Sequence, residues 1–262
     1  MARLNTRAEG VTRTSALHVP REHFSRPDGR PRRKTSLMRR YEAAALKSDG
    51  TLSHEQLVAP AIDLFEEATA AFARGTLVAT PSGPVAIEDL LPGDIVDTRD
   101  GPAQITWIGS TIFYPNTAAD VSCLSHLTRV TAEAFGPATP MTDLLIGPGA
   151  RMVVRREKLR SLLGASAVLA PIQDYTDGDR IFDITPPSPV QMYNFALANH
   201  STVTLSGLEV ETYHPGKLAD PTLGHNVRAL FLSMFPGIEM FEEFGGLIFP
   251  RTRREVIDNL TL

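Results

Sequence analysis

Cys123 and His126 lie three residues apart in the sequence. A thiol beside a histidine could act as a nucleophile with its general base. Residues 117–119 give no helix signal that would place the pair on one helical face, so we expect Cys123 to pack as a small buried hydrophobe. It is also the single cysteine of the chain, which excludes an intramolecular disulfide and a cysteine-based metal site.

Three aspartates, Asp174, Asp177 and Asp179, superficially resemble the start of a calcium-binding loop. Such a loop needs a glutamate at its twelfth position, where this chain has Thr185, so a polar hairpin turn explains the aspartates better. Three histidines are too widely spaced in the sequence for a zinc site: His200, His214 and His225. We therefore expect neither a metal nor another cofactor.

Short apolar and β-branched runs, separated by turn residues, dominate the middle of the chain. Between residues 71 and 107 the turns are Pro81-Ser82-Gly83, Pro92-Gly93 and Asp100-Gly101, and they separate strand-like segments in which Ile95 and Val96 should be buried. Further strands are predicted at 128–131, 143–146, 151–154, 168–172, 180–184, 190–198, 202–205 and 209–213. Short strands at this spacing predict an all-β domain.

Helices are expected only near the two ends of the chain. Residues 37–46 are rich in helix formers and could form a short helix. Residues 53–70 begin with a capping-box pattern, and their apolar residues recur at helical spacing from about Pro60, which predicts an amphipathic lead-in helix. Residues 226–235 predict a helix in a C-terminal extension that packs back on the domain.

Composition bounds the class of protein. The chain has 262 residues, of which 42% are hydrophobic and only 7% aromatic, so it can bury one sizeable core that should be aliphatic. The first 40 residues hold 11 Lys and Arg against 3 Asp and Glu, a net charge of +8, and the rest therefore carries −12. This basic arm is favoured as a disordered tail, with binding of nucleic acid or an anionic surface as the alternative.

No apolar run approaches the roughly 18 residues that a membrane span requires, and the N-terminal arginines precede no apolar signal region. We expect a soluble, cytoplasmic protein, and leave open a secretion signal at the C-terminus.

The sequence of residues 75–96 resembles the opening of the Hint domain; it reads G-T-L-V-A-T-P-S-G-P-V-A-I-E-D-L-L-P-G-D-I-V and is followed by W-I-G at 107–109. This is the self-processing module of Hedgehog proteins and inteins, and the sequence most resembles its bacterial branch. Residues 192–216, with His200, Glu209 and His214-Pro215-Gly216, resemble the closing strands of that branch. The resemblance implies an all-β, horseshoe-like domain of short and bent strands over residues 71–216.

The chemistry of the family, as the resemblance implies it, is an acyl shift in which a Cys or Ser attacks the preceding peptide carbonyl and a histidine protonates the leaving nitrogen. The opening motif Cys-Phe-x-x-Gly-Thr places Ala71 at the nucleophile. The motif Leu-(Leu/Val)-(Ser/Thr)-Pro-x-His-Arg places Gly147 at the hydroxyl and Ala150 at the histidine. These three positions are therefore vestigial, and we expect no catalytic residue.

The whole chain then divides into a basic arm (1–52), a lead-in helix (53–70), a Hint-type domain (71–216) and a C-terminal extension (217–262). We expect a member inactive in autoprocessing and kept as a binding or structural module, with a protein as a possible partner. The alternative is self-cleavage by a non-standard group, for which the candidates are Thr76, Cys123 and His200. The second alternative is nucleic-acid binding through the arm at residues 26–40.

Overall fold

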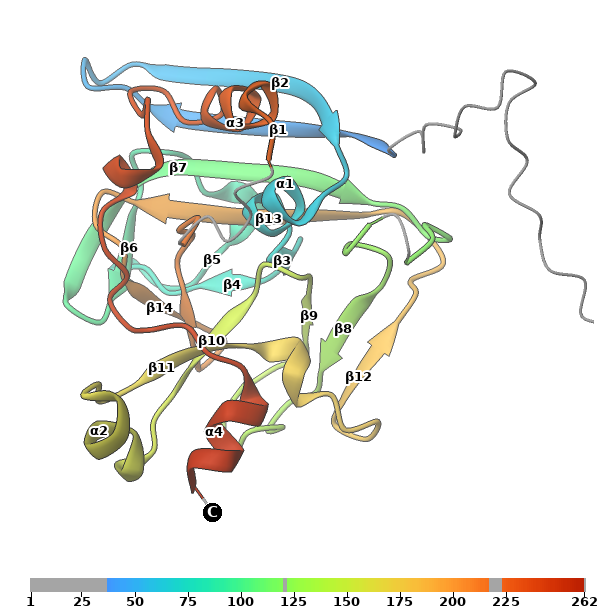
Figure 1. The fold of residues 1–262 in the computed structure, drawn as a ribbon, viewed down its shortest axis with the longest axis vertical. Helices are drawn as coiled ribbons and strands as arrows, with labels where there is room; N and C mark the ends of the chain where they lie inside the picture. The colour runs from blue at the N-terminus through green and yellow to red at the C-terminus, as the bar shows by residue number, and fades with distance from the viewer. Residues whose placement is uncertain (1–36, 120–121, 217–222, 262) are drawn as a thin grey trace, which may run out of the picture. The chain divides into compact units, whose positions relative to one another are not determined.

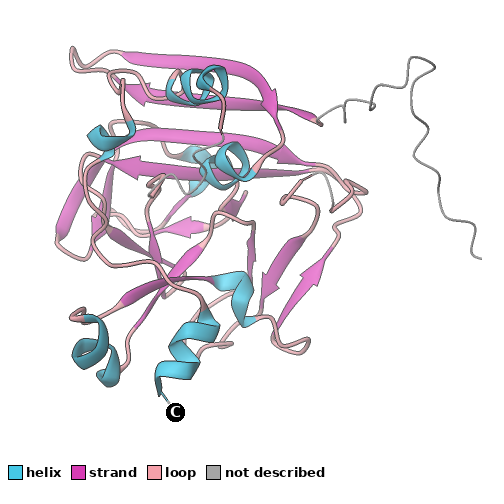
Figure 2. Ribbon diagram, in the orientation of Figure 1, coloured by secondary structure: helices cyan, strands magenta, loops and turns pink. Residues whose placement is uncertain are grey.

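The computed structural model describes residues 37–119, 122–216 and 223–261, and its fold is all-β with a few short helices (Figure 1, Figure 2). The strands are β1 Met38–Leu46, β2 Leu52–Pro60, β3 Phe72–Ala73, β4 Leu77–Val78, β5 Val85–Ala86, β6 Ile95–Thr98, β7 Gly101–Phe113, β8 Leu127–Val130, β9 Leu144–Ile146, β10 Arg151–Val154, β11 Val168–Pro171, β12 Ile181–Ile184, β13 Val190–Leu197, β14 Thr202–Leu205 and β15 Leu208–Glu211. The helices are α1 Asp63–Thr69, α2 Glu157–Leu163, α3 His225–Leu232 and α4 Arg254–Thr261, and the 3-10 turns are η1 Ile87–Asp89, η2 Ile172–Tyr175 and η3 Phe241–Phe244.

One hydrogen-bonded path joins most of these strands in the order β11-β10-β15-β14-β6-β7-β13-β3-β9-β8-β12. The long strand β7 is the branch point, because its first residues pair with β6, while its later residues pair with β13 on one side and β1 on the other. The two-residue strand β3 therefore lies between β13 and β9, which brings the head of the domain beside residues 146–150.

The segment 37–60 is a β-hairpin, so the helix predicted for 37–46 is wrong and the start of the helix predicted for 53–70 is strand. Tyr41, Ala43 and Ala45 alternate as buried residues with partly exposed ones, the period of a strand, and β1 pairs with β2 over its full length and with β7. Pairing on both edges outweighs the helix propensity of single residues. The helical part of 53–70 is confined to α1.

Helix α1 is anchored by a buried carboxylate, Glu66, which is fully inaccessible. Its Oε1 accepts from Arg39 Nε at 2.9 Å and from Ser122 Oγ at 2.6 Å, and its Oε2 accepts from the Leu124 amide at 3.0 Å. A buried charge is tolerated only when it is paired and hydrogen-bonded in this way. Arg39 belongs to the basic arm in the sequence, yet its side chain is only 6% exposed and forms an ion pair with Glu66.

The interior has two main clusters of different character. The central cluster is aliphatic, as the composition predicts, and contains residues such as Val96, Ile105, Ile146 and Leu205. The second is aromatic, contrary to that expectation, and lies between the β1–β2 hairpin, β7 and the C-terminal extension. Its rings are Tyr41, Phe65, Trp107, Tyr213, Phe231 and Phe235.

Trp107 is the centre of the aromatic cluster. Its ring stacks on Phe235 with centroids 4.4 Å apart, and its Nε1 donates to the Met234 carbonyl at 2.7 Å. A Cβ on Gly109 would lie 2.1 Å from the indole ring, so the glycine two residues along β7 makes room for the tryptophan. The C-terminal extension is thereby bound to the middle of the sheet.

Val96 is buried as predicted, but Ile95 is 42% exposed, because alternate side chains of β6 point to opposite faces. Among the helices that the structure describes, none is long and apolar enough to span a membrane.

We predict that Glu66→Gln destabilises the protein by about 3–5 kcal/mol, because it leaves Arg39 as a buried charge without its counterion. Urea unfolding followed by Trp107 fluorescence measures the change. The matched control is Glu55→Gln on the exposed side of β2, which should change the free energy of unfolding by no more than about 0.5 kcal/mol. Equal effects of the two substitutions would contradict the anchoring role of Glu66.

Candidate functional site

The peptide bond between Ala70 and Ala71 lies where α1 ends and β3 begins, at the position that self-cleavage would attack. Its N–H, on Ala71, donates to the Tyr193 carbonyl at 3.0 Å, and its C=O, on Ala70, accepts from the Gly149 amide at 3.0 Å. Neither alanine is more than 1% exposed. The bond is therefore an ordinary, fully satisfied element of the buried backbone.

Gly147 and Gly149 close this position from the other side. A Cβ on Gly147 would lie 2.5 Å from the Ala70 carbonyl oxygen, and a Cβ on Gly149 would lie 2.2 Å from the Glu67 carbonyl oxygen. Both distances are well below van der Waals contact, so only glycine fits without movement of α1. A side-chain hydroxyl at position 147 has no room in this arrangement.

Ala150 is also sealed. It is 1% exposed, its amide donates to the Gly147 carbonyl at 3.2 Å, and its carbonyl accepts from the Ile172 amide at 3.1 Å. Ala71 and Ala150 belong to the same aliphatic cluster. The centre of the domain is thus closed and apolar at the two positions that the family motifs assign to the nucleophile and the histidine.

Two candidate substitute nucleophiles hold their hydrogen-bonding groups in fixed contacts. Thr76 is 6% exposed and its hydroxyl donates to the Ala73 carbonyl at 2.7 Å. Cys123 Sγ donates to Glu66 Oε2 at 3.1 Å. Burial and the neighbouring Glu66 carboxylate raise the pKa of the Cys123 thiol far above its ordinary value, so the reactive thiolate is suppressed.

The aspartate loop is a hairpin turn. Asp177 Oδ1 accepts from the amides of Asp179, Arg180 and Ile181, each at 2.9 Å, and these hydrogen bonds hold the pKa of its carboxyl below the ordinary value. A carboxylate that caps three amides closes a turn, which is the role expected from the sequence.

A polar cavity of about 370 Å³ lies beside the sealed centre. Its walls come from α1, the loop before β8, the η2 turn and the start of the C-terminal helix, and they mix both signs of charge. Ion pairs already occupy many of these groups, such as Arg253 with Asp174 at 3.1 Å. Neither Ala71 nor Ala150 lines this cavity. The lining residues are Asp63, Glu67, Cys123, His126, Pro148, Arg151, Pro171, Gln173, Asp174, Thr176, Asp183 and Arg253.

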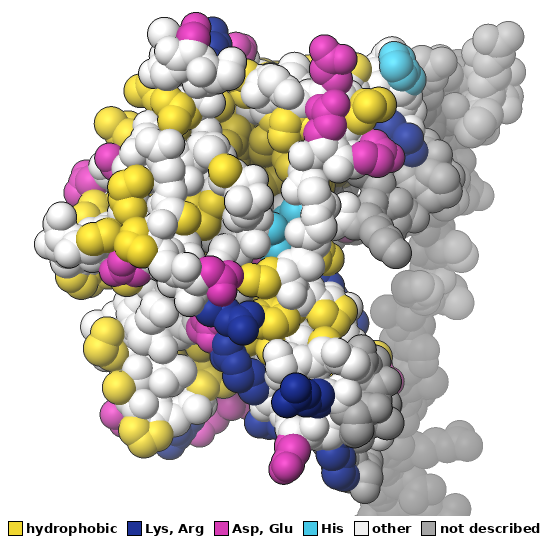
Figure 3. Space-filling view, turned by 90° about the vertical axis from the view of Figure 1, so that its left-hand side faces the viewer, with side chains coloured by type: hydrophobic (Ala, Val, Ile, Leu, Met, Phe, Trp, Pro, Cys, Tyr) yellow, Lys and Arg dark blue, Asp and Glu magenta, His cyan; other side chains and the backbone are white. Residues whose placement is uncertain are grey.

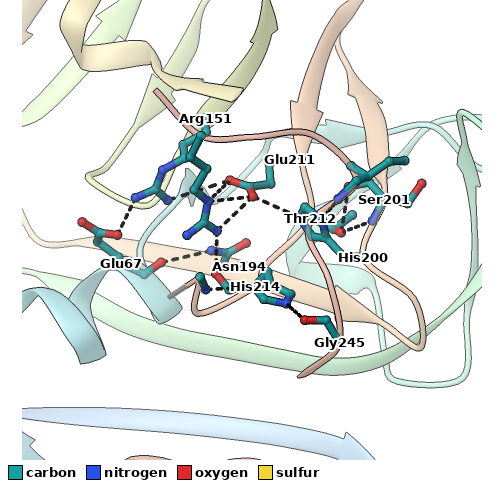
Figure 4. A network of polar contacts seen from close by, with 12 residues as sticks. Glu67, Arg151, Asn194, His200, Ser201, Glu211, Thr212, His214 and Gly245 are labelled. Carbon is teal, nitrogen blue, oxygen red and sulfur yellow. Dashed lines mark hydrogen bonds and ion pairs between the residues drawn. The ribbon is translucent and has the colours of Figure 1, made fainter. Parts of the chain in front are cut away.

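The third candidate, His200, is part of a buried ionic network that its isolated position in the sequence did not reveal (Figure 4). Its Nε2 lies 3.0 Å from Glu211 Oε1, with side chains only 1% and 3% exposed. Arg251 Nε also donates to Glu211, at 2.9 Å, and Arg151 Nη1 lies 3.9 Å from the same carboxylate. Arg151 in turn donates to Glu67 on α1 at 2.6 Å, which links the network to the sealed centre.

His214 stands next to His200, with ring centroids 5.1 Å apart, although the two are distant in the sequence. His214 Nδ1 accepts from the Gly216 amide at 2.8 Å, so Nε2 carries the proton that it donates to the Gly245 carbonyl at 3.1 Å. His200 Nδ1 likewise accepts, from the Ile248 amide at 3.0 Å. In both rings Nδ1 is therefore a hydrogen-bond acceptor, and Nε2 faces an acceptor oxygen, of Glu211 for His200 and of Gly245 for His214.

The architecture is that of an all-β domain with the Ala70–Ala71 junction buried at its centre. The family model for the Hint domain matches residues 70–217, more than half of the chain, and the chain belongs to this family. The solution structure of a bacterial intein-like domain from Clostridium thermocellum is similar at 14% identity, covering 55% of this chain and 99% of that one with a TM-score of 0.37. No curated protein matches the chain.

We predict that Gly147→Ala and Gly149→Ala each lower the free energy of unfolding by about 1–3 kcal/mol, because the added methyl group overlaps the carbonyl oxygen of Ala70 or of Glu67, respectively. Thermal and urea unfolding measure the loss. Gly246→Ala is the control, since a Cβ there meets open space. Losses no larger than that of the control would mean that α1 does not press on these glycines.

We also predict that stability falls with acidification. Burial, followed by the charge of His200, lowers the pKa of His214, so its contribution is complete above the ordinary histidine value of about 6.5 and is lost as pH falls toward the folded-state pKa. Burial alone would raise the pKa of Glu211, but His200, Arg251 and Arg151 lower it, so its contribution is lost at still lower pH.

The measurement for this prediction is the free energy of unfolding between pH 5 and 8 in wild type and His214→Gln. Replacement should flatten the slope below pH 6.5 by up to about 1.4 kcal/mol per pH unit, the value for one proton. His225→Gln, at an exposed position, is the control and should leave the slope unchanged. An unaltered slope in His214→Gln would assign the pH dependence to other groups.

Proposed function

We propose that this Hint-domain protein has lost autoprocessing and is retained as a binding or structural module. The observation that carries the proposal is the Ala70–Ala71 bond, whose two polar groups are both hydrogen-bonded and whose surroundings exclude solvent. An acyl shift needs a nucleophile within reach of that carbonyl and a proton donor near the nitrogen. The methyl groups of Ala71 and Ala150 supply neither.

The contacts of the substitute candidates support the same conclusion. The Thr76 hydroxyl is bound to a backbone carbonyl, the Cys123 thiol is kept protonated beside Glu66, and His200 is paired with Glu211. Activation requires the opposite environment, with a base beside the hydroxyl or a positive charge beside the thiol. Neither Thr76 nor Cys123 has such a neighbour, and the two ring nitrogens of His200 already contact the Ile248 amide and Glu211.

Binding through the basic arm remains a prediction from the sequence, because residues 26–36 lie outside the described part of the chain. Of the arginines nearest to it, Arg39 is committed to Glu66. Figure 3 shows Lys and Arg side chains gathered in the lower half of one face, at the level of α2 and α4, where acidic side chains accompany them. This mixture of charges does not favour nucleic acid as the partner.

We predict that the purified protein stays intact during prolonged incubation with a thiol or with hydroxylamine. Intact-mass spectrometry reads the outcome, and fragments of about 70 and 190 residues would establish self-cleavage at Ala70–Ala71. Ala71→Cys is the matched variant: it restores the nucleophile, yet we expect it to remain uncleaved because Ala150 offers no proton to the leaving nitrogen. Cleavage in the variant alone would show that only the nucleophile is missing.

A further inference from the structure

Residues 245–252 of the C-terminal extension cross the Hint domain in the manner of a bound peptide. Four of their main-chain groups are hydrogen-bonded to the domain. The Pro250 carbonyl accepts from the Leu169 amide and the Thr252 amide donates to the Leu169 carbonyl, both at 2.9 Å, while the Ile248 amide and the Gly245 carbonyl bond to His200 and His214. The segment also forms a parallel bridge to β11 at Leu169.

The bonding alternates along the segment. The main-chain groups of residues 248, 250 and 252 face the domain edge, and the side chains of Phe249 and Arg251 enter it between them. Alternation of this kind is the geometry of an added β-strand, in which main-chain hydrogen bonds supply affinity and pockets for alternate side chains supply specificity. The two inserted side chains therefore define what the groove selects.

Phe249 occupies an apolar subsite. It is 6% exposed and packs with Ala167 and Leu169, both fully buried, and with Val153. The guanidinium of Arg99 lies over its ring, 4.9 Å from the centroid, which favours an aromatic side chain over an aliphatic one.

Arg251 occupies an acidic subsite. Its Nε lies 2.9 and 3.2 Å from the two oxygens of Glu211, and its Nη2 donates to the His214 carbonyl at 2.6 Å. Glu211 is 5% exposed, so the pair is largely shielded from solvent. A Cβ on Gly216 would lie 2.5 Å from Arg251 Nη1, and the absence of a side chain there leaves room for the guanidinium. A planar fork fits this site, whereas the point charge of lysine does not.

The imidazole rings of the two histidines hydrogen-bond to main-chain groups of the segment. His200 Nδ1 accepts from the Ile248 amide and His214 Nε2 donates to the Gly245 carbonyl. These bonds hold any extended peptide in the correct register and carry no preference for its side chains. Both contacts lie before Arg251 along the segment, and they give the buried histidine pair a role that does not depend on self-cleavage.

We infer that β11, His200, His214 and Glu211 form a peptide-recognition groove for an extended segment with phenylalanine two positions before arginine, and that residues 245–252 occupy it in cis. Tethering gives the chain's own segment a high effective concentration, so a partner segment with the same Phe-x-Arg pattern enters only when the resident one is weakened or displaced. This assignment rests on the proposed binding role, but it does not depend on the loss of self-cleavage.

The test uses full-length protein and a fluorescent synthetic peptide of residues 246–253, Gly-Leu-Ile-Phe-Pro-Arg-Thr-Arg. In the variant Phe249→Ala/Arg251→Ala the resident segment loses both inserted side chains, and we expect the peptide to bind at least about tenfold more tightly than to wild type. Peptides with Phe or the first Arg replaced by Ala should bind the variant at least about tenfold more weakly, a difference of about 1.4 kcal/mol.

Two further variants serve as controls. Arg253→Ala removes an arginine that is outside the groove and pairs with Asp174, and it should bind the peptide no better than wild type. Adding Glu211→Gln to the double variant removes the acidic subsite and should abolish the gain. Equal binding by the wild type and the double variant, or equal binding of the three peptides, would overturn the inference and leave these contacts as internal packing.

Trp107 fluorescence and near-ultraviolet circular dichroism check that the double variant is folded. If the double variant is not folded, Arg251→Lys is used instead, because it keeps the positive charge but removes the planar guanidinium. Faster amide hydrogen exchange at Ile248 and Thr252 in this variant, with Trp107 unperturbed, supports the groove, and unchanged exchange overturns it. Intact mass decides the proposed loss of self-cleavage separately, so the two ideas can fail independently.

Discussion

The close approach of two glycines to the end of one helix is the constraint on which the centre of this domain depends. Gly147 and Gly149 press against the carbonyl oxygens of Ala70 and Glu67, and the Glu67 carbonyl also accepts from Asn194 Nδ2 at 3.1 Å. The neighbouring residue on α1, Glu66, fixes the helix through its contacts with Arg39 and Ser122. The present position of α1 therefore leaves no room for a side chain at position 147 or 149.

The segments outside the family match contribute a core of their own. The hairpin β1–β2, α1 and α3 supply Tyr41, Phe65 and Phe231, which close over Trp107 on the matched domain. Farther along, Phe249 and Arg251 fill the two subsites beside β11. The segments before and after the Hint domain thus contribute to its stability. They form a second, aromatic cluster beside the aliphatic one and bury large ring surfaces there.

Much of the architecture could be predicted from the sequence, and the exceptions have physical causes. Proline and glycine turns separate the short strands, so the all-β domain and most strand positions follow from local chemistry. Residues 38–46 could not be assigned locally, because alanine and glutamate favour a helix until β2 and β7 provide hydrogen-bonding partners. The ionic network was missed for a similar reason: His200 meets Glu211 across the β14–β15 pair, but Arg151 and Arg251 arrive from distant elements.

The way in which β1 is woven into the sheet has a consequence for any break in the chain at Ala70–Ala71. Residues 37–70 pair with β7, contain the Arg39–Glu66 ion pair, and contact Phe231 of the C-terminal extension edge-to-face through Phe65. After cleavage at this bond, the two fragments would therefore stay associated in the same fold. The N-terminal fragment would not dissociate as a released product. The segment in front of this bond is thus a structural strand of the sheet that the rest of the domain completes.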